Sequence, residues 1–482
     1  MRLSRSESIL KSLDAEGFSY SKRSIPIDGG TIHVLYIQNL TDRPSLSELV
    51  VKPLAVHFQR RVPGLQMLHA RDVMESLLYA DDCRLESDSG MVRDHILNGM
   101  TVILLSWDEE YIIVNLRKVA HRAVAEPQIE YTLRGPRDCF VENLTVNLSL
   151  IRYRVKDPKL RIQHFMVGRR SKADVAVIYI EDIANESIVR TVQKRIEAID
   201  VDTIGESGEL ETYLQNSKWS LFPQMGLVER SDMACHLLSE GKVLVLVDGS
   251  GLVLSAPKVF CEFFHSCDDR YDNPYFGLMM RLVRYMSLFF VLTASSYFVA
   301  ITTFHMDALP SQYTLDLAQM RTKVPVPPIL SALMLEFIVE LLREALLRIP
   351  KQIGSAVGIV SAIVIGQASI AAGIFSPLLL IIVSAALLAS FVMPDYALIN
   401  PFRILKIVAL LSTSFLGFYG LILFLSLLLA HMVSMDSFGV PYLAPFAPFN
   451  RYDFLRSLMF NITFSPLRHK FLKDKDKTRS KP

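Results

Sequence analysis

The sequence predicts an α+β domain of two subdomains, in which helices and strands alternate in an α/β-like manner, followed by an all-α transmembrane helix bundle. Two observations carry this prediction. Short β-branched runs alternate with segments of helical periodicity in the first region, which is typical of a domain built on sheets. Charged residues occur throughout Met1–Arg284, whereas Ile353–Pro394 contains no Asp, Glu, Lys or Arg. Because a helix of a soluble protein presents one polar face to water, a charge-free stretch of this length favours lipid.

The first subdomain is expected over residues 1–125. Two apolar runs, Met100–Ser106 and Tyr111–Leu116, are separated by a short polar segment. This pattern predicts a β-hairpin, which we expect to close the subdomain. Thr31–Ile37 is predicted to be a further strand, and Arg71–Tyr79 a helix.

The second subdomain is expected over residues 126–280. Phe140–Val155 carries apolar residues at helical spacing and is predicted to be a helix. Asn185 is expected to cap a helix over Ile188–Ile199, because its side chain accepts hydrogen bonds from the exposed amides of a first turn. The other predicted elements are strands at Ile162–Val167, Val175–Ile180, Lys242–Val247 and Leu252–Ser255 and helices at Ser207–Gln215 and Asp232–Ser239.

Composition and motifs exclude several classes of function. The formal net charge is +2, and no arginine-rich stripe with interleaved aromatic residues is present, so we expect no nucleic-acid partner. A Gly-rich phosphate loop and a Gly-x-Ser-x-Gly motif are both missing, so we expect no catalytic residues and no cofactor. Cys261, His265 and Cys267 are irregularly spaced, which argues against a metal site. The first residues lead into no apolar run, which predicts a cytoplasmic N-terminal domain without a secretory signal peptide.

The transmembrane domain is expected over residues 281–433. Tyr285–Phe304 is an uncharged apolar run of about 20 residues, which is long enough to cross a hydrocarbon core of ~30 Å. Arg281 and Arg284 stand at its N-terminal edge and fit a cytoplasmic boundary. The further predicted spans are 353–374, 377–393 and 407–429.

The segment Ile329–Ile349 is predicted to be an amphipathic helix that does not fully cross the membrane. It carries five charged residues, mainly at spacings of three and four, which we take as candidates for a coupling helix: Glu336, Glu340, Arg343, Glu344 and Arg348. Five charges facing lipid would be costly. The helix is therefore interfacial, re-entrant, packed against partner protein, or the wall of a water-filled vestibule, and its composition favours the interfacial placement.

The span 353–374 is rich in small residues. Gly354 and Gly358 are four residues apart, a spacing that lets membrane helices approach closely. Tight helix packing explains this composition, and so does a pore helix of which several copies surround a narrow aqueous path. In the second case apolar rings gate the pore by dewetting, and the candidate pore and gate residues are Gly354, Gly358, Ile363, Val364, Gly366 and Gln367.

Residues 434–482 are expected to form a basic cytoplasmic tail. Nine Lys and Arg residues fall between Arg451 and Lys481, and such a segment belongs on the cytoplasmic side. Since the N-terminal domain is expected there too, the number of crossings must be even, and the four spans above satisfy this condition. A fifth crossing by Ile329–Ile349 would place the tail outside.

An ordered set of short motifs resembles the A subunit of the GerA-type spore germination receptors. The motifs that carry the resemblance begin near residue 134 and continue almost to the tail: Arg134-Gly135-Pro136, Val141-Glu142-Asn143-Leu144, Leu221-Phe222-Pro223-Gln224, Glu240-Gly241-Lys242-Val243, Pro325-Val326-Pro327-Pro328, Glu340-Leu341-Leu342-Arg343-Glu344-Ala345, Val364-Ile365-Gly366-Gln367-Ala368, Gly417-Phe418-Tyr419-Gly420 and Ser437-Phe438-Gly439-Val440-Pro441-Tyr442.

The resemblance implies a non-enzymatic receptor subunit in the spore inner membrane. Similar proteins assemble with a B subunit, a transporter-like membrane protein thought to bind the nutrient, and with a C subunit, a lipoprotein. The A subunit is then expected to be a homo-oligomer in contact with membrane lipid, and to form a nutrient-gated cation channel.

Two other classes of function remain open from the sequence. A membrane-anchored scaffold or signalling subunit needs no pore of its own, and its soluble domain does the work. A secondary transporter predicts repeat symmetry between two membrane halves and interrupted helices that carry substrate groups.

Overall fold

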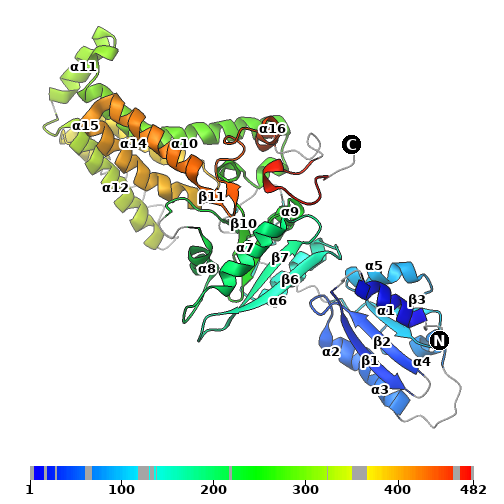
Figure 1. The fold of residues 1–482 in the computed structure, drawn as a ribbon. Coiled ribbons are helices and arrows are strands. Elements are labelled where there is room, and N and C mark those ends of the chain that lie inside the picture. Colours follow the sequence, from blue (N-terminus) through cyan, green and yellow to red (C-terminus); the bar gives the residue numbers. More distant parts are fainter. Residues whose placement is uncertain are drawn as a thin grey trace. The chain divides into compact units, whose positions relative to one another are not determined.

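The computed structural model describes residues 5–15, 19–27, 30–59, 68–117, 130, 135–136, 138–216, 220–322, 324–349, 366–459 and 467–478. The chain folds into two compact units (Figure 1). Unit 1 comprises residues 1–215, 225–257 and 467–482, and unit 2 comprises residues 216–224 and 258–466.

Unit 1 contains two five-stranded sheets, both antiparallel throughout. The first has the order β1-β2-β4-β5-β3 and is built from β1 (Ser21–Ile27), β2 (Gly30–Tyr36), β3 (Cys83–Glu86), β4 (Thr101–Leu105) and β5 (Tyr111–Val114). The second has the order β6-β7-β9-β10-β8 and is built from β6 (Leu160–Val167), β7 (Ala173–Ile180), β8 (Gly226–Val228), β9 (Val243–Val247) and β10 (Val253–Ala256). Because the strands pair antiparallel, unit 1 is α+β. Helices and strands do alternate along the chain as in an α/β domain, but the described strands form no parallel pairs.

Helices accompany each sheet. The first sheet is accompanied by α1 (Arg5–Ala15), α2 (Arg43–Leu46), a π-helical turn at Ser47–Val51, α3 (Lys52–Gln59), α4 (Ala70–Ser76), a 3₁₀ turn at Ser89–Met91 and α5 (Val92–Leu97). The second is accompanied by α6 (Leu144–Arg154), α7 (Glu186–Glu197), α8 (Ser207–Leu214) and α9 (Ser231–Ser239). The predicted hairpin is confirmed as β4 and β5, and Asn185 caps α7 by accepting a hydrogen bond from the Ser187 amide at 3.1 Å.

Both faces of the first sheet are covered because alternate side chains of its central strands point in opposite directions. Val102 and Leu104 pack with residues of α1 and α5, whereas Ile103 and Leu105 pack with residues of α2 to α4. All five residues of β4 are therefore buried. The boundary expected between residues 125 and 126 lies outside the described residues.

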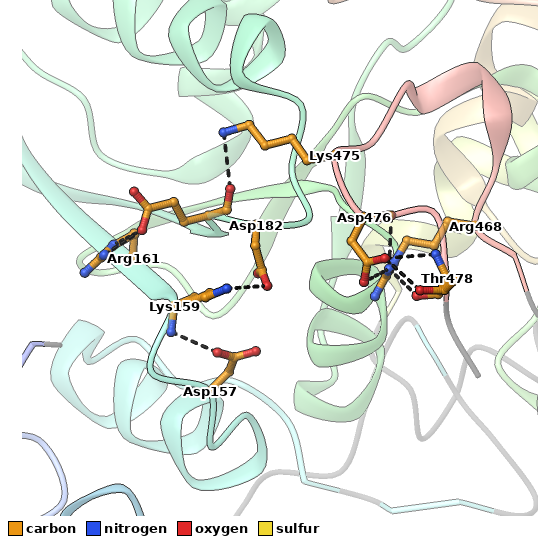
Figure 2. A network of polar contacts seen from close by, with 9 residues as sticks. Asp157, Lys159, Arg161, Asp182, Arg468, Lys475, Asp476 and Thr478 are labelled. Carbon is orange, nitrogen blue, oxygen red and sulfur yellow. Dashed lines mark hydrogen bonds and ion pairs between the residues drawn. The ribbon is translucent and has the colours of Figure 1, made fainter. Parts of the chain in front are cut away.

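The C-terminal residues 467–478, which we call the strap, fold onto the second sheet region of unit 1. Leu472 is fully buried, and its carbonyl oxygen accepts a hydrogen bond from Asn185 Nδ2 at 3.0 Å. Arg468 donates to the Ser239 carbonyl oxygen at 2.8 Å and to Asp476 Oδ2 at 2.7 Å. Figure 2 shows Arg468 meeting Asp476 and Thr478 of the same strap. This part of the expected basic tail is therefore an integral piece of unit 1.

Unit 2 is mainly helical. Its helices are α10 (Pro274–Thr303), α11 (Ser311–Thr322), α12 (Pro328–Arg348), α14 (Pro377–Ser390), α15 (Tyr396–Ser434) and α16 (Arg451–Met459), with 3₁₀ turns at Phe260–Phe264, Asp268–Arg270 and Met306–Ala308 and a two-stranded ladder of β11 (Asp436–Ser437) and β12 (Val440–Pro441). Capping residues in the local sequence fix where several of these helices begin. Asn273, Ser376 and Asp395 each cap the helix that follows with a side-chain oxygen.

Helix α15 is a helical hairpin whose turn is Gly417. Gly417 has φ 59° and ψ −140°, which interrupts the helix. A Cβ atom placed on Gly420 would lie within 3 Å of the Ser412 backbone, so the chain reverses between these residues. The arm 396–416 and the arm 418–434 then pack together in one apolar core. The two arms are about 30 Å and about 25 Å long at 1.5 Å per residue.

The predicted spans need two corrections. We expected one helix over 407–429, but the turn at Gly417 divides it, because only glycine adopts that backbone conformation without strain. We expected a span at 377–393, but α14 ends at Ser390 and is about 21 Å long, which is shorter than a hydrocarbon core. In the described part of the chain, α10 and α15 are the two helices long and apolar enough to cross a membrane. Most of 353–374 lies outside the described residues.

Candidate functional site

The predicted amphipathic helix is α12, and three of its five charges point into unit 2. Glu336 is 3% exposed. Its Oε1 accepts a hydrogen bond from Ser295 Oγ of α10 at 2.6 Å, and its Oε2 accepts one from Lys406 Nζ of α15 at 2.5 Å. One helical turn later, Glu340 Oε2 accepts from Arg403 Nε at 2.9 Å, and Lys406 Nζ also lies 3.4 Å from Glu340 Oε1.

We call Glu336, Glu340, Arg403 and Lys406 the charge cluster. The residues on each helix are four and three apart, so each pair occupies one face of its helix. The cluster ties α12 to the first arm of α15. The cluster brings two carboxylates together with two cations. Removing one partner of such a buried ion pair destabilises a protein by about 3–5 kcal/mol, because the other charge stays buried without a partner.

Arg343 adds a third cation beside the charge cluster. Its Nη2 donates to Ser390 Oγ at the end of α14 at 3.1 Å, and its guanidinium lies 5.7 Å from the centre of the Phe391 ring. Arg343 therefore joins α12 to α14, whereas Lys406 joins it to α15. Three helices are held around the inward face of α12 by polar contacts.

The other two predicted coupling residues lie elsewhere. Glu344 and Arg348 form an exposed pair on α12, with Arg348 Nε 3.0 Å from Glu344 Oε1. An exposed pair of this kind contributes little to stability. Three charged residues of α12 therefore face the interior of unit 2, and the two at its C-terminal end are exposed.

Most of the predicted pore and gate residues, namely Gly354, Gly358, Ile363 and Val364, lie outside the described residues. Gly366 and Gln367 begin a short helical stretch over 366–371. Gln367 is exposed, and a Cβ atom on Gly366 would lie 3.7 Å from Leu380 Cδ2 of α14. The end of the small-residue segment thus passes close to α14.

A second polar anchor holds the start of α10. Asp269 Oδ2 accepts hydrogen bonds from Arg281 Nε at 3.1 Å and from Arg284 Nη1 at 2.6 Å. Arg281 is 1% exposed and also donates to the Ser457 carbonyl oxygen of α16 at 2.9 Å. The two arginines expected at a membrane boundary are therefore bound to a carboxylate.

Sequence reasoning missed Arg403, Lys406 and Ser295 as members of the site. Arg403 and Lys406 directly precede the span expected from residue 407 and were not singled out. The sequence did carry a signal for them, because two cations three residues apart stand directly before a long apolar run. No group of three or more His, Cys, Asp or Glu side chains that suits a metal ion is found among the residues that the structure describes.

Comparison with known proteins gives the family. Residues 8–470 match the family described as Bacillus/Clostridium GerA spore germination protein. This chain belongs to the GerA family. It is 35% identical over 418 residues to spore germination protein KA of Bacillus subtilis, covering 86% of this chain and 76% of that protein. It is also 35% identical over 416 residues to spore germination protein GerLA of Bacillus cereus, covering 86% and 84%.

A solved structure is similar as well. It is the N-terminal domain of the A subunit of the Bacillus megaterium spore germinant receptor GerK3, with 22% identity, a TM-score of 0.39, and coverage of 54% of this chain and 97% of that one. The GerA-family relatives are spore germination proteins and not enzymes, which gives this chain a role in spore germination. The two long apolar helices agree with membrane association.

Proposed function

We propose that this GerA-family chain is the A subunit of a nutrient-responsive germination receptor and forms an oligomeric, nutrient-gated cation channel in the spore inner membrane. It assembles with a transporter-like B subunit that binds the nutrient and with a lipoprotein C subunit. Several copies form a ring in which residues 353–374 surround the axis, and Ile363, Val364 or Gln367 narrow the path in the resting state.

The observation that carries the proposal is the charge cluster. Ionisable side chains among membrane helices are costly and are kept for function. Here they join α12 to α15, whose surface is otherwise rich in exposed apolar residues such as Phe415, Ile422 and Leu427. A contiguous apolar surface of this kind suits lipid or another membrane protein.

The position of α12 in the chain supports a coupling role. Residues 353–374 follow α12 directly, so a displacement of α12 relative to α15 is transmitted through the backbone to the small-residue segment. A nutrient can shift the channel only as far as it favours the open state over the closed one. The charge cluster is suited to such a two-state change, because its ion pairs can form in one arrangement of α12 and α15 and be lost or exchanged in another.

The strap supports the proposed topology. The chain leaves unit 1 at residue 257 and returns to it at residue 467. A strap that packs on the same folded unit supports a topology in which both ends of the intervening region are on one side of a membrane. The number of crossings is then even, in agreement with N- and C-terminal regions that are both cytoplasmic.

The test is cation flux through the purified full-length protein in liposomes, alone and together with its B and C subunits. Val364→Ala shortens an apolar gate residue, so it is expected to raise the leak in the absence of nutrient. Val392→Ala, the same change at an exposed position beyond α14, is the matched control and is expected to leave the leak unchanged.

Other outcomes separate the alternatives. Flux that requires co-transport of a substrate supports a secondary transporter, and the absence of flux under every condition supports a scaffold. An unchanged leak in Val364→Ala contradicts a gate at this residue.

A further inference from the structure

Unit 2 contains a cavity of about 280 Å³ that the proposed function does not use, and we call it the end cavity. It lies between α11, the end of α10 and the beginnings of α12 and α14, with Phe298, Leu317, Ser331 and Leu379 in its lining. Figure 1 shows α11 at one end of the helices of unit 2. The cavity volume is close to the lower end of the range for ligand pockets, which is roughly 300–1,000 Å³.

The wall of the end cavity between α11 and α12 is stiff. It contains Pro325, Pro327 and Pro328, whose rings fix the backbone φ angle. The Val326 carbonyl oxygen accepts a hydrogen bond from Ser331 Oγ at 3.5 Å, and the Pro327 carbonyl oxygen accepts one from the Ser331 amide at 3.0 Å. A wall that is ordered before a ligand arrives loses little conformational entropy on binding.

Three hydroxyl groups line the end cavity, those of Thr302, Ser331 and Ser376. Ser376 Oγ accepts a hydrogen bond from the Leu379 amide at 3.2 Å, so its own hydrogen can be donated to a ligand. The contact that Ser331 Oγ makes at 3.5 Å is long and therefore weak, so a closer acceptor can replace it. The beginnings of α12 and α14 add the partial positive charge of a helix N-terminus. This side of the cavity suits an oxygen atom that accepts hydrogen bonds.

The rest of the lining is mainly apolar. Phe298, Leu317 and Leu379 supply hydrocarbon surface, and no Asp, Glu, Lys or Arg among the residues that the structure describes lines the end cavity. A full negative charge would be buried here without a countercharge, which is costly. The lining therefore favours an uncharged molecule with an apolar body and an oxygen acceptor.

We propose that the end cavity binds a small uncharged molecule whose apolar body packs on Phe298, Leu317 and Leu379 and whose hydroxyl or carbonyl oxygen accepts hydrogen bonds from Ser331 and Ser376. The bound molecule contacts α10, α12 and α14 together, and α12 also carries the charge cluster. A small molecule can thus bias the position of α12 directly on this chain. The site is separate from the nutrient site proposed on the B subunit, and its occupancy is measured without ion flux.

The test is protection of a cysteine on α11 in the full-length protein in detergent. Leu317→Cys places a thiol in the lining of the end cavity, and Leu315→Cys makes the same change at an exposed position of the same helix. Benzyl alcohol, which carries an apolar ring and one hydroxyl, is expected to slow thiol labelling of Leu317→Cys in a saturable manner and to leave Leu315→Cys unchanged. Labelling of the five native cysteines is measured in the parent protein and subtracted.

Two analogues of benzyl alcohol test the chemistry of the site. Ethylbenzene has a methyl group in place of the hydroxyl, so it is expected to protect Leu317→Cys at least about five-fold more weakly, which corresponds to ~1 kcal/mol. Sodium benzoate keeps the ring but carries a negative charge, so it is expected to give no protection. Equal protection by ethylbenzene, or protection by benzoate alone, overturns the proposal.

Variants of Ser331, which is 2% exposed, test the cavity itself in the Leu317→Cys background. Ser331→Leu fills the cavity and is expected to abolish protection, whereas Ser426→Leu, the same change at an exposed position of α15, is expected to retain it. Ser331→Ala adds no volume. It is expected to weaken protection by benzyl alcohol and to leave protection by ethylbenzene unchanged, which a misfolded site would not do. Absence of protection in Leu317→Cys, or full protection in Ser331→Leu, overturns the proposal.

Discussion

Lys406 Nζ lies 2.5 Å from Glu336 Oε2, and both side chains are almost fully buried. This contact joins α15 to α12 at the point where Ser295 of α10 also binds the carboxylate. Among helices that expose many apolar side chains, it is a specific link that hydrophobic packing alone would not provide. We therefore expect gating to depend on this pair.

Breaking the pair from one side is expected to destabilise unit 2. Glu336→Gln leaves the Lys406 charge buried without its strongest partner, so we expect a loss of about 3–5 kcal/mol in the free energy of unfolding. The double variant Glu336→Gln with Lys406→Met removes both charges and is expected to regain most of that loss. Thermal unfolding of the purified protein in detergent measures each step of the cycle.

The control for that cycle is Arg348→Gln, which breaks the exposed pair with Glu344. Exposed pairs contribute at most about 1 kcal/mol. If Glu336→Gln and Arg348→Gln reduce stability equally, the buried cluster has no special structural role.

Gly417 is expected to tolerate no side chain. Its φ of 59° is unfavourable for other residues, and a Cβ atom would lie 2.9 Å from His305 Nε2. Gly417→Ala should therefore lower the stability of the folded protein by about 1–3 kcal/mol, measured as a fall in Tm. Gly439 also has a positive φ, but a Cβ atom there meets open space, so Gly439→Ala should cost less. Equal losses would show that the close packing at the turn is unimportant.

The strap is expected to detach when its arginine is neutralised. Arg468 binds the Ser239 carbonyl oxygen and Asp476, and Arg468→Gln removes both contacts. Hydrogen exchange of the amides of residues 467–478 should then become faster, whereas exchange in β9 stays slow. Lys477→Gln changes an exposed neighbour and should have no effect. Unchanged exchange in Arg468→Gln would mean that the buried Leu472 holds the strap by itself.

The contribution of Asp476 to docking of the strap is expected to change with pH in strong acid. The Thr478 amide and Arg468 hold the pKa of Asp476 at about 2. This pKa is below that of an unfolded aspartate, so the contribution of the carboxylate is fully present above about pH 4 and is lost as the pH falls through about 2. Fluorescence anisotropy of a dye on the strap should fall in that window, and Asp476→Asn should remove the transition.

Much of unit 1 was predictable because its elements are short and carry local signals. Two apolar runs separated by a short polar segment marked β4 and β5, and Asn185 marked the start of α7. The pairing of β2 with β4 and of β7 with β9 was not predictable, because it depends on contacts between strands far apart in the chain. The strap was expected to be part of a basic cytoplasmic tail, since nothing local reveals that Leu472 has a buried site on unit 1.

In unit 2 the composition predicted apolar helices but not their ends or partners. Residues 407–434 form a mainly apolar run without Asp, Glu, Lys or Arg, in which Gly417 and Gly420 hint at a reversal. The charges of α12 were recognised as unusual, but their partners Arg403 and Lys406 follow about sixty residues later. Only the packing of α12 against α15 brings them together.

The most direct measurement of the central claim is chemical modification of Gln367→Cys during cation flux through liposomes. All five native cysteines precede residue 268, so the parent protein treated with the same thiol reagent is the control. If residues 353–374 surround an aqueous path, a water-soluble, positively charged thiol reagent should reduce the flux of Gln367→Cys and leave that of the parent unchanged. Full flux after complete modification of Gln367→Cys would contradict a pore at this segment.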